Sequence, residues 1–451
     1  NLVEVAVLAY SASVEKSCMD KCSRRLLPYL LFMFLLCYID RTNLGFAGIQ
    51  MSPELGLTAS TFGFGAGLFF IGYFIFEVPS NLCLAKFGAR RWIARIMVTW
   101  GAVATLMCMI NGTTSFLVMR FLLGASEAGF YPGVIYFIGE WFPNKYRAKA
   151  LSRFNMAQPC ALILGSIISG YLISALDGAM GYSGWRWLFF VEGIPTVLFG
   201  FVTLYYLTDK PSDAEWLTDE EREWLTNEMA TEAAAIKGAN EDYSIMKALT
   251  HPSVLFLGVA YFLVVCEGTY GINMWIPQML KQWSNMSTTE IGFIGALPFL
   301  CALISVYIFG WSSQKHQESK WHLNVAVLMA SISLIAAMFV EGTVATMVCL
   351  CIGAAGIFAC TPLFWTIPAQ FLTGTAAATG IAVINSIGNL GGFFGPTAVG
   401  MVKDATGDFR YGLLLLGVSV LIGGIMCFYM NNRYQGKVNF DKAHEDASKL
   451  D

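Results

Sequence analysis

The chain repeats one feature along nearly its whole length: apolar segments of about twenty residues, separated by short polar breaks. A helix needs ~20 mostly apolar residues to cross a hydrocarbon layer ~30 Å thick, and in lipid the backbone must satisfy its own hydrogen bonds, as a helix does. The composition agrees, because 56% of the residues are apolar and 13% are charged, against about 25% charged in soluble domains. We therefore predict an all-α membrane protein.

Apolar runs bounded by charges, prolines and glycines predict twelve transmembrane helices. They fall into two sets of six, separated by the one long hydrophilic segment inside the chain. The expected spans are 27–46, 61–83, 92–110, 115–139, 152–175, 186–207, 253–276, 289–310, 322–340, 344–367, 377–400 and 411–431.

The six-plus-six pattern predicts two pseudo-symmetric bundles. Gly165 and Gly170 in the fifth span parallel Gly391 and Pro396 in the eleventh, and small residues let helices pack closely in lipid. Transporters whose halves rock about a midplane site share this layout. We expect an N-terminal tail (1–25), a bundle (26–207), a cytoplasmic linker (208–250), a second bundle (251–432) and a C-terminal tail (433–451).

The polar segments outside the bundles are expected to act as connectors. Within the linker, the stretch from Leu217 to Arg222 is typical of a capped, solvated helix start. In the N-terminal tail, Met19 is a plausible natural start, so the residues before it carry no functional expectation.

The distribution of Lys and Arg predicts that both termini face the cytoplasm. Of the 28 such residues, Arg41 and Arg120 lie deep within spans, and almost all others fall in segments or at span ends that this orientation places inside, as the positive-inside rule requires. The exceptions are Arg186, Lys281, Lys403 and Arg410. We expect a multi-pass protein of a cell membrane, the bacterial inner membrane in particular. A net charge of −3 gives no reason to expect a nucleic-acid partner.

Cysteines and histidines predict no metal site or cofactor. Ten of the twelve cysteines lie in or beside apolar stretches, without metal-ligand spacing, and are expected to act as small apolar residues. The four histidines lie in loops, in the C-terminal tail or at span edges. No phosphate-binding loop, nucleophile elbow or zinc-binding pattern appears, so we do not expect an enzyme.

Four ionisable residues within spans are the best candidates for function. Asp40 and Arg41 lie in the first span, and Arg120 and Glu127, almost two helical turns apart, share one face of the fourth. Such residues usually face a cavity or a partner. An arginine is suited to clamp a substrate carboxylate, and the two acids could bind and release protons. The alternative is that the four only neutralise one another in packing.

Other polar and aromatic side chains could complete a cavity. Amides suit a hydroxylated substrate, but buried amides also hold helices together, and isolated aromatic rings commonly face lipid. The amide candidates are Gln158, Asn385 and Asn389, and the aromatic candidates are Tyr38, Tyr73, Tyr270, Trp275 and Trp365.

Several further acids have weaker assignments. Glu267 in the seventh span could shape specificity or bind a second proton, or could face solvent. Glu77, Glu140 and Glu192 lie near expected span ends, where pairing with an interfacial arginine is the ordinary role. Glu140 with Arg147 could form a gate.

Longer motifs resemble the major facilitator superfamily, and in particular its anion:cation symporter family. They are Tyr38-Ile-Asp-Arg-Thr-Asn43, Phe87-Gly-Ala-Arg-Arg-Trp92, Arg120 with Glu127-Ala-Gly-Phe-Tyr-Pro132, Glu140-Trp-Phe-Pro143 and Asn385-Ser-Ile-Gly-Asn-Leu-Gly-Gly-Phe-Phe-Gly-Pro396. The resemblance runs from about Leu26 to Tyr434 and implies the major facilitator fold.

The resemblance also implies separate roles for the candidate residues. Asp40 and Glu127 would be proton sites, Arg41 the carboxylate anchor and Gln158 a hydroxyl contact, with Tyr38, Tyr73, Trp365 and one of the two asparagines completing the pocket. We expect a monomeric symporter that imports a sugar acid or hydroxy-carboxylate with protons by alternating access. The alternatives are an exchanger or facilitator without proton coupling, a symporter of an aromatic acid, and a sensor that does not transport.

Overall fold

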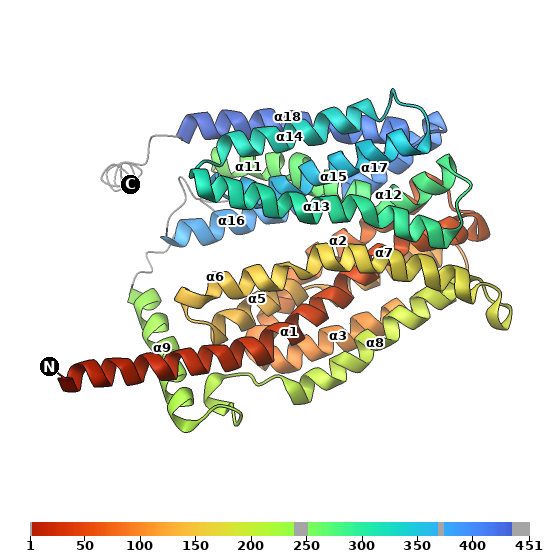
Figure 1. Ribbon diagram of the computed structural model, residues 1–451. Helices are drawn as coiled ribbons and strands as arrows, with labels where there is room; N and C mark the ends of the chain where they lie inside the picture. The colour runs from red at the N-terminus through yellow and green to blue at the C-terminus, as the bar shows by residue number, and fades with distance from the viewer. Residues whose placement is uncertain (1, 239–250, 369–373, 435–451) are drawn as a thin grey trace.

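The computed structural model describes residues 2–238, 251–368 and 374–434, and throughout these residues the chain is helical and contains no β-strand. Ten helical segments in the described ranges are long and apolar enough to cross a membrane, and Lys320–Ala336 is a shorter apolar helix. The chain is therefore a multi-pass membrane protein, as its sequence predicts. In Figure 1 the helices of the first half form the lower group and those of the second half the upper group, with the start of α1 and the end of α18 at one end.

The first half contains eight α-helices that form six crossings. They are α1 (Leu2–Leu55), α2 (Ala59–Phe87), α3 (Ala89–Leu106), α4 (Thr113–Glu127), α5 (Phe130–Trp141), α6 (Asn144–Asn155), α7 (Ala157–Leu176) and α8 (Gly184–Tyr206). Short 3₁₀ turns follow at η1 (Met107–Met109), η2 (Ala179–Gly181) and η3 (Pro211–Asp213).

The second half follows helix α9 (Asp219–Gly238). Its elements are α11 (Pro252–Tyr261), the π-helix η4 (Phe262–Cys266), α12 (Glu267–Trp283), α13 (Thr288–His316), α14 (Lys320–Ala336), α15 (Thr343–Phe364), α16 (Gly374–Asn389), α17 (Gly391–Thr406) and α18 (Arg410–Tyr434).

Some expected spans are interrupted. The span expected over 115–139 is broken between α4 and α5, where Gly129 has φ +87°, a conformation that glycine adopts readily. A Cβ atom there would lie 2.3 Å from Ser80 Oγ. The spans expected over 152–175 and 377–400 are broken near Met156 and Leu390, and that over 253–276 contains the π-helix.

The N-terminal extension of α1 packs against the linker helix α9. Ser17 Oγ and Lys21 Nζ donate to the Glu221 carboxylate at 2.7 and 2.8 Å. Thr218 and Glu221 form the reciprocal cap that the sequence predicts at the start of α9. Glu221 itself is buried rather than solvated. Although burial opposes its charge, the donors Lys21 and Ser17 and the Thr218 backbone lower the pKa of Glu221 to about 2.

The halves pack closely at the end away from the start of α1 and the end of α18. Helix α2 packs against α17, α7 against α13 and α1 against α12, and these helices meet toward the right of Figure 1. Glycines allow the contact, because a Cβ on Gly63 would lie 2.3 Å from the Pro396 carbonyl oxygen. Asp404 of α17 also accepts hydrogen bonds from the backbone amides of Ala59 and Ser60, at 3.0 and 2.7 Å, at the start of α2. These contacts hold the two halves together beyond the candidate site.

Candidate functional site

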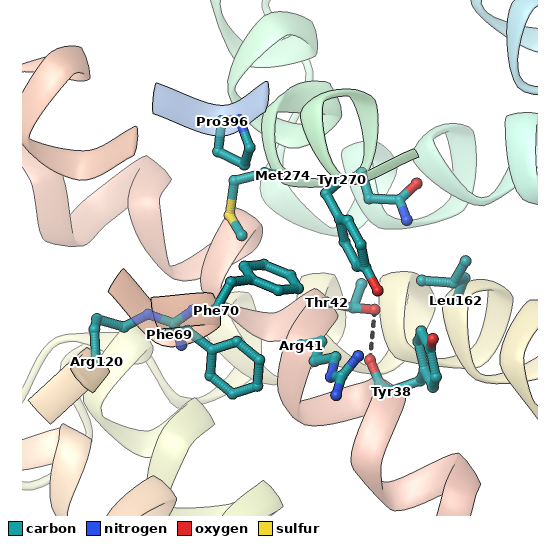
Figure 2. A pocket seen from close by; sticks show the side chains of 11 residues that line it. Tyr38, Arg41, Thr42, Phe69, Phe70, Arg120, Leu162, Tyr270, Met274 and Pro396 are labelled. Carbon is teal, nitrogen blue, oxygen red and sulfur yellow. Dashed lines mark hydrogen bonds between the residues drawn. The ribbon is translucent and has the colours of Figure 1, made fainter. Parts of the chain in front are cut away.

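A small cavity lies where the two halves meet, between α1, α2, α4 and α7 of the first half and α12 and α17 of the second. Its free volume is about 30 Å³, room for one or two water molecules. Figure 2 shows side chains from both halves around it. The lining residues are Tyr38, Arg41, Thr42, Phe69, Phe70, Arg120, Leu162, Tyr270, Asn273, Met274 and Pro396.

Arg41 is the principal charged group of this cavity. Its side chain is 18% exposed and pairs with Glu127, which is 1% exposed. Arg41 Nε donates to Glu127 Oε1 at 3.0 Å, Nη2 contacts the same oxygen, and Cys37 Sγ donates to it at 3.2 Å. Glu127 Oε2 is buried without a hydrogen-bond partner. The pair therefore uses one carboxylate oxygen and leaves part of the guanidinium facing the cavity.

Aromatic rings surround the Arg41 guanidinium. Its Cζ lies 5.0, 5.2 and 5.8 Å from the ring centroids of Tyr38, Phe69 and Tyr73, distances at which a ring face attracts a cation. Tyr38 lines the cavity, whereas Tyr73 is buried beside Arg41 outside the lining. The rings position the guanidinium without neutralising its charge.

Arg120 reaches the same cavity but does not pair with Glu127. Its Nε and Nη2 donate to the backbone carbonyls of Gly65 and Ala66 of α2, at 3.3 and 3.2 Å. The Phe69 ring lies between the two guanidinium groups, with each Cζ 5.2 Å from its centroid (Figure 2). Both arginines thus line one cavity, as the sequence suggests, while Glu127 forms its ion pair with Arg41 and not with Arg120.

Asp40 lies outside the cavity lining, although it adjoins Arg41 in the sequence. It is buried and points into the first half. Asn43 Nδ2 of α1 and Thr196 Oγ1 of α8 donate to it there, both at a distance of 3.5 Å. The sequence predicts that all four charged groups face one cavity. In this structure Arg41 and Arg120 line it, and Asp40 and Glu127 do not.

The second half contributes Tyr270, Asn273 and Met274 of α12. The Tyr270 ring packs against Phe70 across the halves, with centroids 4.4 Å apart. Sequence reasoning identified Tyr270 and missed Asn273, although residues three apart share a helix face. It also missed Thr42, Phe69 and Phe70.

The other predicted pocket residues lie outside the lining in this structure. The amides Gln158, Asn385 and Asn389 are half-buried. Trp365 packs against Tyr261 and Phe364. Trp275 is buried and donates to the Pro396 carbonyl at 3.1 Å, which is a packing role.

Glu267 and Arg147 have partners away from the cavity. Glu267 is buried at the start of α12, directly after the π-helix, and accepts a hydrogen bond from Ser419 of α18. Arg147 forms its ion pair with Glu232 of α9 at 3.0 Å, so it contacts the linker helix rather than Glu140.

The placement of Glu192 corrects an expectation. It lies within α8 rather than near an interfacial arginine, is 7% exposed, and accepts a hydrogen bond from Ser169 Oγ of α7 at 3.0 Å. The apolar run of α8 continues on both sides of this acid, so the span boundary was a poor guide to its depth.

Comparison with known proteins agrees with the fold. The chain matches the family described as Major Facilitator Superfamily over residues 30–396 and 268–450. It is 43% identical to a "Putative tartrate transporter" of Agrobacterium vitis, over 92% of this chain and 91% of that protein. It is 38% identical to a "Quinolone resistance transporter" of Acinetobacter baumannii, over 92% and 95%.

Solved structures with low sequence identity share the fold. A bacterial homologue of the human lysosomal transporter Spinster, solved in an inward-facing and occupied conformation, superposes with a TM-score of 0.75 over 91% of this chain and 97% of that one, at 18% identity. The family match, the full-length relatives and the helical architecture agree, and the chain belongs to the major facilitator superfamily of membrane transporters and is not an enzyme.

Proposed function

We propose that this protein imports a small organic anion together with protons by alternating access. The observation that carries the proposal is the cavity between the halves. There the Arg41 guanidinium pairs with the buried acid Glu127 and also lines the cavity. A guanidinium there can hold a substrate carboxylate with paired hydrogen bonds. Arg120 supplies a second positive charge on the other side of Phe69.

Proton coupling follows from competition for Arg41. Ionised Glu127 occupies two N–H groups of Arg41. A proton on Glu127 removes its charge, weakens this pair and frees those donors for a substrate carboxylate. Proton binding and anion binding then favour one another, as linkage requires. We propose Asp40 as a second proton site, because it is buried next to Arg41 without an ion-pair partner among the described residues.

Alternating access is proposed from the distribution of contacts. The cavity is too small for a hydroxy acid, so substrate entry requires the halves to separate. They are held together at the end away from the start of α1 and the end of α18, which leaves the end near the start of α1 to open. With both termini cytoplasmic, this conformation belongs to the inward-facing part of the cycle. One chain contains both halves, so we propose a functional monomer.

The proposed substrate is a hydroxylated carboxylic acid. Relatives with similar identity carry names for tartrate transport and for quinolone resistance, so an aromatic acid is the main alternative. Tyr38, Thr42, Asn273 and Tyr270 offer polar groups for hydroxyls at the cavity wall. We propose Gln158 and the asparagines of α16 as further contacts once the halves have moved.

The test is uptake into liposomes that contain the purified protein. The panel is radiolabelled tartrate, a sugar acid, a quinolone and a neutral hexose, each with and without an inward proton gradient and with the membrane potential clamped. Accumulation of one acid above equilibrium, abolished by a protonophore, is expected. Saturable uptake of the acid at a rate independent of the proton gradient would identify an exchanger or facilitator and refute symport. Transport of the hexose would refute anion recognition.

A further inference from the structure

The thiol of Cys37 adds a third hydrogen bond to the Glu127 carboxylate. Cys37 lies one turn before Arg41 on α1, so the two side chains share a face of that helix. Its Sγ donates to Glu127 Oε1 of α4 at 3.2 Å, and Arg41 Nε and Nη2 donate to the same oxygen. Cys37 and Glu127 are each 1% exposed. Three donors from α1 therefore converge on one oxygen of a buried carboxylate.

The two oxygens of Glu127 are in opposite situations. Oε1 accepts three hydrogen bonds, whereas Oε2 is buried without a hydrogen-bond partner. A carboxylate oxygen has about two lone-pair positions, so a proton on Oε1 would have to displace a donor. A charged oxygen that is buried without a donor is costly, and a proton on Oε2 removes that charge. Oε2 is therefore the open position for a proton.

Cys37 differs from Arg41 in how it responds to a substrate. Arg41 lines the cavity, whereas Cys37 does not. The thiol is also uncharged, so a substrate carboxylate attracts it far less than it attracts the guanidinium. The thiol can stay on Glu127 Oε1 while the guanidinium leaves, and it then keeps the carboxyl group in place.

Charged groups approach Glu127 from several helices. The charged or titratable groups that interact electrostatically with it are Cys37, Asp40 and Arg41 of α1, Tyr73 of α2 and Arg120 of α4. Helix α3 also packs against α4, but its charged residues, Arg90, Arg91 and Arg95, lie in its first two turns. Within this group Cys37 is the uncharged donor to Glu127.

We propose that Cys37 is a positioning residue for proton coupling: its thiol holds Glu127 Oε1 so that the proton binds and leaves at Oε2 while Arg41 moves between Glu127 and the substrate. In the proton-binding step an O–H bond forms at Oε2 and the hydrogen bonds from Arg41 to Oε1 are released. The thiol also supports the ionised carboxylate, and so it helps to set the pH at which Glu127 exchanges its proton. This inference rests on the proposed proton coupling through Glu127.

The first test is the pH dependence of binding of radiolabelled tartrate to purified protein. Cys37→Ala removes a donor from ionised Glu127, which favours the protonated acid, so the midpoint of the pH profile should move upward by about half a unit to one unit. Cys37→Ser keeps a donor and should return the midpoint toward the wild-type value. Cys360→Ala is the matched control, because it removes another fully buried thiol, in α15 of the second half, and should leave the midpoint unchanged.

A double variant shows whether Cys37 acts through Glu127. Glu127→Gln has no carboxylate to support and is expected to have a flat pH profile, so Cys37→Ala added to it should change that profile no further. A wild-type midpoint in the single variant Cys37→Ala would mean that the thiol only packs, and would overturn the inference. A pH shift caused by Cys37→Ala that persists in the Glu127→Gln background would overturn it as well.

The infrared S–H stretching band tests the contact without ligand or transport. A thiol that donates to an ionised carboxylate absorbs at lower frequency than a free thiol, and the Cys37 band is identified by its loss in Cys37→Ser. We expect the band to move to higher frequency as Glu127 is protonated at low pH, and to lie at higher frequency at every pH in Glu127→Gln.

The same measurement separates this inference from the proposed function. An identical Cys37 band in wild type and Glu127→Gln would overturn the inference, even if symport is intact and even if Cys37→Ala fails to fold. A band that responds to pH as expected, in a protein whose anion uptake is independent of the proton gradient, would instead refute the proposed function alone.

Discussion

Glu127→Gln tests the competition for Arg41 directly. In the structure, two N–H groups of Arg41 are committed to one Glu127 oxygen, and a substrate carboxylate must take them over. Hydrogen bonds to charged groups contribute roughly 1.5–3 kcal/mol, and 1.4 kcal/mol is about tenfold in affinity. Glutamine keeps the shape but not the charge. We therefore expect anion affinity above neutral pH to rise by about 10- to 100-fold, and its pH dependence to flatten.

The measurement is equilibrium binding of the transported anion to purified protein between pH 5 and 9. Wild-type affinity should strengthen as the pH falls, because protonated Glu127 releases Arg41. Glu267→Gln is the matched control: it removes another buried acid, one that does not line the cavity, and should keep the wild-type pH dependence. Weaker binding by Glu127→Gln, or an unchanged slope with pH, would refute the competition.

Three further predictions concern other parts of the molecule. Arg41→Ala should weaken anion binding at least ~100-fold, because it removes the anchor and leaves Glu127 buried without its partner; normal affinity in a binding assay would refute the anchor role. Asp40→Asn should keep exchange of internal and external substrate but lose gradient-driven accumulation in liposomes. The pKa of Glu221, about 2 in the folded chain, lies below its ordinary value of 4.5, so its contribution to stability is complete above about pH 4.5 and is lost as the pH falls toward 2. Glu221→Gln should therefore lower the melting temperature at pH 7 but not near pH 2; equal losses at both would contradict this.

Much of the fold could be predicted because lipid restricts the possibilities. A backbone in hydrocarbon must be helical or closed in a barrel, and the length and spacing of the apolar runs then determine the crossings. The breaks inside crossings were harder to predict, because they depend on tertiary contacts. Gly129 leaves the helical conformation where Ser80 approaches it, and nothing local in the sequence distinguishes it from glycines that stay helical.

The candidate site was predictable in part, for a related reason. Burying an ionisable side chain in a membrane span is energetically expensive, so such a residue usually has a function. This reasoning identifies Arg41, Arg120 and Glu127 without a structure. Their partners did not follow from spacing. Arg120 and Glu127 share a helical face, yet Arg120 binds backbone carbonyls at Gly65 and Ala66. The small residues of α2 leave these carbonyls accessible, which spacing along α4 cannot reveal.

The predicted amides show a different reason why sequence alone does not determine the site, which is that the lining of the cavity depends on conformation. A transporter has at least two arrangements of its halves, and one sequence encodes both. Gln158 and Asn385 are predicted because amides within spans suit a hydroxylated substrate, but the lining of the cavity depends on how far the halves are separated. In this structure Asn273 lines the cavity and those amides do not. The two sets are compatible if α16 and the start of α7 join the site on opening. Substrate protection of a cysteine introduced at position 158, but not at the exposed position 341, would then be expected during turnover.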